Sequence, residues 1–281
     1  MNSLIKDHRV RCFLIDNLYP HIQFQDININ LQEIPVYVLK DSWPIRYHCA
    51  IALKLAKINN HHPVEMATQI LQGLSGESEW IEIIISVTPS GIIAFELTDQ
   101  AIATWLQQMT QTPLPLSSLP VSSTEVFIEN DDQSLFKIQY AHARCCSLLR
   151  LADRDRIISL AEPQLQRTPA LWLFREPDPI PWLECERKLR LQHHSERRLI
   201  SQLLTTFDLD QTSSDQKYWK TKANLISDTF QEFYGQCRIW GEVKLETPEF
   251  AQARLGLIAV TQAVLRYILQ EKLGFIAPLE L

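Results

Sequence analysis

The sequence predicts a two-part fold, with an α+β module over residues 1–109 followed by an all-α helical bundle over residues 125–281. Three observations support this division. The first 109 residues mix alternating apolar and polar residues, typical of strands, with stretches of helical spacing. Residues 110–124 contain three prolines and several serines and threonines without an apolar period, which is typical of a linker. Beyond residue 132, apolar residues recur mostly at helical spacing.

The α+β module is expected to begin with at least one strand before residue 44, because polar and apolar residues alternate over 22–25 and 27–31. A first helix is expected from residue 45, where helical spacing relates Tyr47, Ile51, Leu55 and Ile58. Pro63 is expected to open a second helix, since proline is favoured in the first helical turn.

The same module is expected to end with a β-hairpin and a helix. Residues 81–87 and 93–97 alternate like strands, and the sequence between them, Thr88-Pro89-Ser90-Gly91, is typical of a turn. A helix is predicted over residues 99–109.

The second module is predicted to be a helical bundle with one proline-rich interruption at residues 177–181. The last helix has Thr247 and Pro248 at its start and Gly274 just past its end, which are favoured boundary residues. The predicted helices span residues 134–152, 155–166, 184–207, 216–240 and 248–273.

Composition is that of a globular protein, with 46% hydrophobic and 21% charged residues. No stretch approaches the roughly 18 apolar residues of a membrane span, and residues 1–8 lack the apolar region of a signal peptide. We therefore expect a cytoplasmic protein with no membrane partner. The six cysteines, including adjacent Cys145 and Cys146, are expected to be reduced and buried.

The net charge of −6 argues against binding nucleic acid by bulk electrostatics. Residues 1–132, however, carry 7 Lys and Arg against 15 Asp and Glu, whereas residues 133–281 carry 20 against 18. The first part therefore has a balance of −8 and the second of +2. Residues 144–198 hold 11 basic residues, of which 10 are arginine, the side chain best suited to bidentate contacts with phosphate or guanine.

Four stretches carry a family resemblance: Phe136–Arg150, Glu196–Phe207, Ala253–Pro278 and Tyr47–Ala67. The first three resemble the anticodon-binding domain of arginyl-tRNA synthetases, and the fourth is similar to the N-terminal tRNA-elbow module of those enzymes. The resemblance implies that the helical bundle is of the anticodon-binding type. It also implies that the catalytic domain, which the family keeps between these two modules, is missing.

Two stretches depart from the family pattern. Gly91-Ile92-Ile93-Ala94 stands where the N-terminal module usually reads Gly-Phe-Ile-Asn, and the chain ends in Leu281 where the family tends to have methionine near the anticodon loop. Leu281 keeps an apolar contact at that position but argues against base-specific recognition.

Catalytic motifs are absent from the sequence. There is no His-x-Gly-His tetrapeptide, phosphate-binding loop or dinucleotide fingerprint, and 7 glycines leave little for a glycine-rich cradle. We expect no enzymatic activity and no cofactor. No metal is expected either, because Cys185, His193 and His194, or His61 and His62, fit no zinc-ligand spacing.

The candidate RNA-binding or anionic-ligand residues are Lys137, Tyr140, Arg144, Arg150, Arg154 and Arg156. Helical spacing places the first three on one stripe together with Ser147, whereas Leu135, Ile138, Cys145, Leu149 and Ala152 are free to face the core. A tyrosine beside an arginine suits unpaired RNA bases and phosphate. The alternative interpretation is that Tyr140 packs between helices, Arg144 pairs with a carboxylate, and the charges at 150–156 form a solvated, salt-bridged face.

Two functions from different classes therefore remain. The first is non-catalytic binding of tRNA or another structured RNA, with the helical domain on an anticodon stem-loop and the N-terminal module on the tRNA elbow. The second is a regulatory module of the same fold, as a monomer or a homodimer, that binds a protein partner or a small anionic nucleotide. Exposed tryptophans in the Trp/Pro-rich segment 169–183, such as Trp172 and Trp182, would favour a protein partner.

Overall fold

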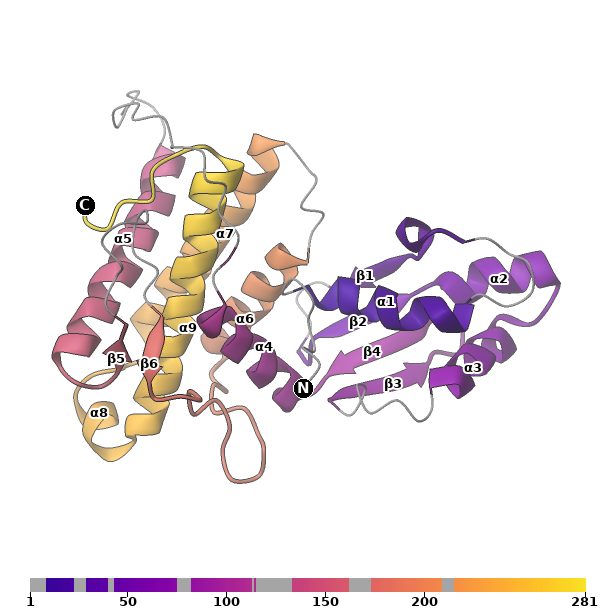
Figure 1. Ribbon diagram of the computed structural model, residues 1–281, viewed down its shortest axis with the longest axis horizontal. Coiled ribbons are helices and arrows are strands. Elements are labelled where there is room, and N and C mark those ends of the chain that lie inside the picture. The colour runs from indigo at the N-terminus through magenta and orange to yellow at the C-terminus, as the bar shows by residue number, and fades with distance from the viewer. Residues whose placement is uncertain are drawn as a thin grey trace. The chain divides into compact units, whose positions relative to one another are not determined.

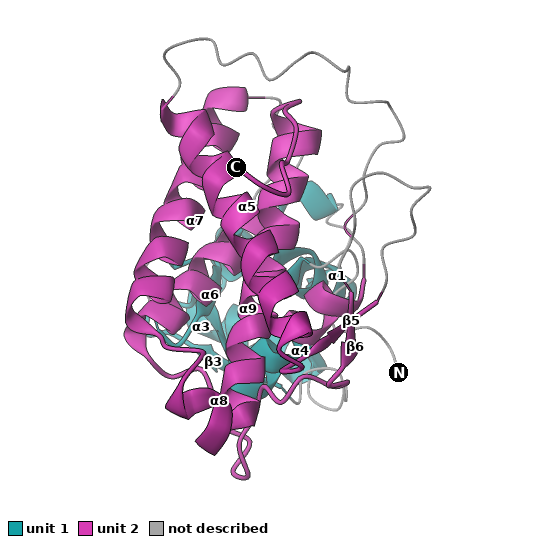
Figure 2. Cartoon of the chain, turned by 90° about the vertical axis from the view of Figure 1, so that its left-hand side faces the viewer, with its two compact units in different colours: residues 1–105 teal, residues 106–281 magenta. Residues whose placement is uncertain are grey.

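The computed structural model describes residues 9–22, 29–39, 43–74, 82–112, 114, 133–161, 173–208 and 215–281. The chain divides into two units, residues 1–105 and residues 106–281 (Figure 2). The division falls inside helix α4 (Asp99–Gln111), slightly before the predicted module end at residue 109. The linker predicted over 110–124 lies largely outside the described residues and stays a prediction.

The first unit combines helices with a four-stranded antiparallel sheet in the order β1-β2-β4-β3 (Figure 1). Alternate strand residues share one buried face, on which Tyr47 lies opposite Phe95 and Cys49 opposite Ile93. The elements in chain order are α1 (Val10–Ile22), a 3-10 turn (Leu31–Glu33), β1 (Val36–Val38), β2 (Arg46–Cys49), α2 (Ile51–Asn59), α3 (Pro63–Leu74), β3 (Ile83–Val87), β4 (Ile93–Leu97) and α4.

The hairpin β3–β4 confirms the prediction, and its turn requires Gly91. The backbone N–H of Gly91 donates to the Thr88 carbonyl at 2.9 Å, and Gly91 has a φ of +85°. A Cβ atom at this position would lie 2.6 Å from Cβ of Pro63, the first residue of α3. Both the left-handed backbone and the close approach therefore favour glycine.

One prediction in this unit is confirmed at other residues, and one is wrong. The strand expected before residue 44 is β1, whereas of the alternating residues that predicted it, Ile22 ends helix α1, residues 23–28 lie outside the described residues, and a 3-10 turn starts at Leu31. The helix predicted from residue 45 begins only at Ile51, because Arg46–Cys49 form β2. Tyr47 lies in strand β2, four residues before Ile51 of helix α2. Both side chains are buried, and their four-residue separation resembles the spacing along one helix face.

The second unit is mainly helical, as predicted, and α9 is its central helix (Figures 1 and 2). Every residue from Ala253 to Tyr267 is buried, which is expected of a helix surrounded by other elements. The elements are α5 (Gln133–Arg154), β5 (Ser159–Leu160), β6 (Phe174–Glu176), α6 (His194–Phe207), α7 (Gln216–Gln236), α8 (Glu242–Glu246), α9 (Pro248–Tyr267) and a π-helical turn (Ile268–Lys272).

Two helix predictions in this unit need correction. The helix predicted over 155–166 is wrong, because Arg156 adopts a left-handed φ of 57° and β5 then pairs with β6. The helix predicted over 184–207 begins only at His194, since a turn precedes it in which Leu183 and Leu189 form a β-bridge and Arg187 has a φ of 58°.

The described part of the Trp/Pro-rich segment packs inside the second unit. Trp182 is 3% exposed and donates its indole N–H to Gln107 Oε1 of α4 at 2.8 Å. The Gln107 amide also accepts the backbone N–H of Ile180 and donates to Asp178. Trp182 therefore offers no exposed surface for a partner, and Trp172 lies outside the described residues.

Candidate nucleic-acid interface

Helix α5 presents aromatic side chains on its solvent-facing side. Phe136 is 60% exposed and Tyr140 is 44% exposed, and their rings stack with centroids 6.3 Å apart and planes at 25°. Ile138, Cys145 and Leu149 of the same helix are buried, as the helical spacing predicts. Tyr140 is therefore available for contact, and it does not pack between helices as the alternative interpretation required.

Arg144 continues this exposed side and is held by a tyrosine of α7. Its Nη2 donates to Tyr234 Oη at 2.8 Å, and its guanidinium carbon lies 5.0 Å from the centroid of the same ring. A neutral phenol fixes the guanidinium without cancelling its charge, unlike the carboxylate of the alternative interpretation. The group is therefore both ordered and electrostatically available to an anion.

Lys137 lies on the border between α5 and α7, where it forms an ion pair with Asp228 of α7. Asp228 compensates the lysine charge in the free protein. An RNA phosphate that contacted Lys137 would have to compete with this half-exposed pair, which is a weak interaction in water.

Arg150 contacts the last residues of the chain. Its Nη2 donates to the Leu279 carbonyl at 3.1 Å, and its Nη1 lies 2.7 Å from Glu280 Oε1. These bonds direct the guanidinium towards the segment that follows α9, here called the closing segment (residues 274–281).

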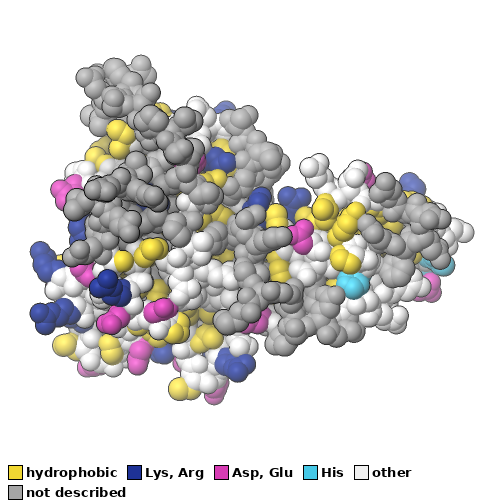
Figure 3. Space-filling view, viewed as in Figure 1, with side chains coloured by type: hydrophobic (Ala, Val, Ile, Leu, Met, Phe, Trp, Pro, Cys, Tyr) yellow, Lys and Arg dark blue, Asp and Glu magenta, His cyan; other side chains and the backbone are white. Residues whose placement is uncertain are grey.

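Arg154 and Arg156 lie at the other end of α5. At a rise of 1.5 Å per residue, Arg154 is about 21 Å along the helix axis from Tyr140. The acidic residues next to these arginines bind elsewhere: Asp153 accepts the backbone N–H of Leu160, and Asp155 accepts from Trp240 and Lys244. Figure 3 shows basic and acidic side chains interleaved over the lower end of this unit. The structure thus places these two arginines far from Tyr140 along the helix.

We call Phe136, Tyr140, Arg144 and Tyr234 the α5–α7 stripe. The sequence identified Tyr140 and Arg144 but missed the other two. Phe136 could have been found because it precedes Tyr140 by four residues on the same helical face. Tyr234 is 90 residues from Arg144 in sequence, and no local pattern connects them.

The closing segment runs beside α5, near the stripe. Gln139 Nε2 donates to the Ile276 carbonyl at 3.0 Å, and His142 Nδ1 donates to the Pro278 carbonyl at 2.8 Å. Since a carbonyl only accepts, this bond assigns the proton to Nδ1 and leaves Nε2 to accept from Gln262 at 2.9 Å. Burial, which disfavours the imidazolium, lowers the pKa of His142 to about 4.

Comparison with known proteins identifies the family. The DALR anticodon binding domain matches residues 138–280, which include most of α5, the α7 tyrosine and the closing segment. The chain belongs to the DALR anticodon-binding domain family. The predicted family resemblance is therefore confirmed for this half of the chain, whereas the resemblance of residues 1–109 to an N-terminal synthetase module stays a prediction.

The DALR domain is similar to part of several arginine–tRNA ligases. The ligase of Synechococcus sp. (strain JA-3-3Ab) is 31% identical over 150 residues, which are 52% of this chain and 22% of that enzyme. The ligase of Gloeobacter violaceus is 35% identical over 145 residues, 49% of this chain and 21% of that enzyme. The matched region thus spans about a fifth of each relative. No solved structure matches this chain.

A buried ion pair joins three helices of the DALR domain. Glu196, at the start of α6, is fully buried and accepts from Arg254 Nε of α9 at 2.7 Å. The Arg254 guanidinium stacks on Phe250 at 3.9 Å and donates to the carbonyl of Arg238, just after α7. Glu196 also accepts the backbone N–H of His193, which completes a capping box. The pair is a structural feature of the fold.

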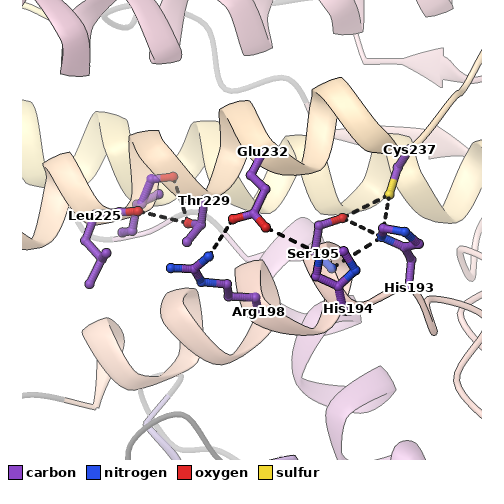
Figure 4. Close-up of polar contacts among 9 residues, drawn as sticks. His193, His194, Ser195, Arg198, Leu225, Thr229, Glu232 and Cys237 are labelled. Atoms are coloured by element: carbon purple, nitrogen blue, oxygen red, sulfur yellow. Dashed lines mark hydrogen bonds and ion pairs between the residues drawn. The ribbon is translucent and has the colours of Figure 1, made fainter.

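His193, Ser195 and Cys237 form a second polar contact between α6 and the end of α7 (Figure 4). Ser195 Oγ lies 2.7 Å from His193 Nδ1 and 3.2 Å from Cys237 Sγ. Cys237 is 2% exposed, and burial raises the pKa of its thiol, so the reactive thiolate is disfavoured. His194 instead faces Glu232 at 3.4 Å, beside Arg198.

The described residues contain no group of three or more His, Cys, Asp and Glu side chains placed to hold a metal ion. In the other candidate pair, His62 accepts the backbone N–H of Val64 at 3.4 Å at the start of α3. In the same described part of the chain, no helix is long and apolar enough to cross a membrane.

Proposed function

We propose that this chain binds tRNA, or a related RNA stem-loop, through its DALR domain without catalysing aminoacylation. The observation that carries the proposal is the position of the α5–α7 stripe. Exposed rings lie together with an arginine that is ordered by a neutral phenol among the described residues, in a chain whose DALR match covers residues 138–280.

The chemistry of the stripe suits the unpaired bases of a loop. Aromatic rings provide sequence-tolerant stacking worth about 1–3 kcal/mol per base. Tyr140 and Phe136 supply two such rings, and Arg144 supplies a planar cation for phosphate or a guanine edge. Lys137 would assist by exchanging Asp228 for a phosphate. We propose that Arg154 and Arg156 contact the backbone further along the RNA.

We propose that the first unit contacts the tRNA elbow and that the chain itself has no site for ATP or arginine. The resemblance of Tyr47–Ala67 to the elbow module supports the first part. The sequence lacks the ATP motif of the synthetases, and the matched region covers about 22% of the Synechococcus ligase, which supports the second part.

Equilibrium binding of a tRNA anticodon stem-loop tests the proposal, with Arg144→Ala and Tyr140→Ala as variants. Each should weaken binding by about 1–3 kcal/mol. Lys188→Ala is the control, because Lys188 is a 61% exposed lysine in the turn region before α6, outside the stripe, and should change little. Equal losses in all three variants would contradict the assignment of the stripe.

The competing function is a regulatory module that binds a protein partner or a small anionic nucleotide. Exposed Phe275 and Ile276, 42% and 38% accessible, would suit an apolar partner. A complex with either ligand that forms without RNA, and that Tyr140→Ala weakens, would favour this function.

A further inference from the structure

The closing segment is held to α5 through its backbone. Three side chains of α5, Gln139, His142 and Arg150, each donate to a carbonyl, those of Ile276, Pro278 and Leu279. These bonds follow one another in the same order along the helix and the segment. These three hydrogen bonds use only the backbone of the segment, and Glu280 adds a side-chain contact by pairing with Arg150.

The attachment leaves apolar side chains of the segment exposed beside the stripe. Ile276, whose carbonyl accepts from Gln139, is 38% exposed, and its neighbour Phe275 is 42% exposed. Gln139 directly precedes Tyr140 in α5. Ala277 is 2% exposed and fixes the segment from the inside. The ordered segment thus extends the surface that starts with Phe136 and Tyr140.

Arg150 is the anchor at the far end of this segment. It uses one guanidinium nitrogen for a main-chain carbonyl and another for the Glu280 carboxylate, so its charge is balanced by the closing segment although its side chain is 39% exposed. In this respect it differs from Arg144, whose partner is a neutral phenol. Two arginines six residues apart in one motif therefore have different environments.

We propose that Arg150 is a positioning residue of the RNA-binding surface: it holds residues 279–280 against α5 and does not contact RNA phosphate. This inference rests on the proposed function. The arginine-rich sequence around Arg150 groups it with the residues expected to contact RNA directly, whereas the positioning role gives it a different function.

The salt dependence of RNA binding distinguishes positioning from contact. Each phosphate contact contributes roughly 0.7–0.9 to the slope of log Kd against log salt. Arg150→Ala should weaken stem-loop binding by about 3- to 10-fold, the range for losing one hydrogen bond and an exposed ion pair, with an unchanged slope. Arg144→Ala should lower the slope by roughly 0.7–0.9. Arg175→Ala, an exposed arginine on β6, controls for lost net charge.

A truncation that removes residues 279–281 provides the matched partner variant. If Arg150 acts through the segment, the truncation and Arg150→Ala should each give the same loss, and the double variant should lose no more. Additive losses, or a slope that falls in Arg150→Ala as it does in Arg144→Ala, would overturn the proposal.

Backbone dynamics of the free protein test the anchoring without RNA. Nitrogen-15 relaxation should show increased motion of residues 279–281 in Arg150→Ala and no change in Arg175→Ala. Unchanged order in Arg150→Ala would refute the anchoring role even if RNA binding holds. If the wild-type protein binds no RNA while the relaxation effect appears, the proposed function fails and the anchoring role stands.

Discussion

At the scale of single residues, the environment of each arginine decides what it can bind. Arg144 is fixed by the hydroxyl and ring of Tyr234 and keeps its charge, whereas Arg150 is directed at the closing segment. The sequence shows two arginines in one helical motif and cannot separate these roles, because both partners lie far away in the chain.

Tyr234→Phe tests the ordering of Arg144. The substitution keeps the ring under the guanidinium and removes only the hydroxyl that accepts from Arg144. RNA affinity should fall by about 0.5–1.5 kcal/mol, the net worth of one hydrogen bond, and less than in Arg144→Ala. The melting temperature should stay near that of the wild type. A loss as large as that of Arg144→Ala would show that Tyr234 itself contacts the RNA.

His142 makes stability depend on pH in the acid range. Its folded pKa of about 4 lies below the usual 6.5, so the neutral form stabilises the fold above pH 6.5 and this contribution is lost as pH falls towards 4. The free energy of unfolding, measured with urea, should therefore decrease by about 2–3 kcal/mol from this group between pH 7 and pH 4.5. His142→Gln should lack this part of the decrease. An identical pH profile in both proteins would contradict the prediction.

At the scale of secondary-structure elements, α9 shows how close packing constrains the sequence. A Cβ atom on Gly256 would collide with the Trp182 ring, which lies against this central helix. Gly235 of α7, in contrast, has nothing within 4 Å of its hypothetical Cβ. The two helical glycines therefore differ in the space around them and form a matched pair.

Gly256→Ala should destabilise the protein by about 1–3 kcal/mol, because the extra methyl forces Trp182 or α9 to move. Gly235→Ala should stabilise it by up to about 1 kcal/mol, since alanine favours the helix. Urea unfolding of both variants measures the difference. Equal effects of the two substitutions would show that Trp182 does not pack on α9.

Much of the element pattern could be predicted, and the failures have local causes. The β3–β4 hairpin has strict alternation around Gly91, and α9 has Pro248 at its first position, so both were predictable. Tyr47 was wrongly assigned to a helix because Tyr47 of strand β2 and Ile51 of helix α2 are both buried and lie only four positions apart, across a short connection. The helix over 155–166 was wrongly predicted because Arg156, not glycine, takes the left-handed position after α5.

Only the part of the candidate site that lies on one face of α5 was predictable from the sequence. The spacing of Lys137, Tyr140 and Arg144 placed them on one side of α5, and the structure agrees. Phe136 needed only the same spacing. Tyr234 and the closing segment needed tertiary contacts between distant parts of the chain, which periodicity does not contain.

At the scale of the whole molecule, the two parts of the chain differ in charge. Residues 133–281 carry slightly more basic than acidic residues, whereas residues 1–132 have a balance of −8. Long-range attraction to RNA is therefore weak, and the proposed binding depends on local contacts of the stripe. We expect modest affinity with a clear dependence on salt.

No aminoacylation by this chain is expected, because its sequence contains no motif that would hold ATP. ATP–pyrophosphate exchange with arginine and tRNA should stay at background. An arginyl-tRNA synthetase in the same assay serves as the positive control. Exchange above background would show that the chain has a catalytic site that the sequence motifs do not reveal.

The binding of tRNA as a function of salt tests the central claim most directly. Between about 50 and 200 mM salt, log Kd should rise linearly with log salt by roughly 0.7–0.9 for each phosphate contact. Apolar burial against a protein partner, in contrast, is little weakened over this range. A steep, linear dependence that Arg144→Ala reduces is the result we predict. No association with tRNA at about 50 mM salt, together with a salt-resistant complex with a protein or nucleotide, would contradict the claim.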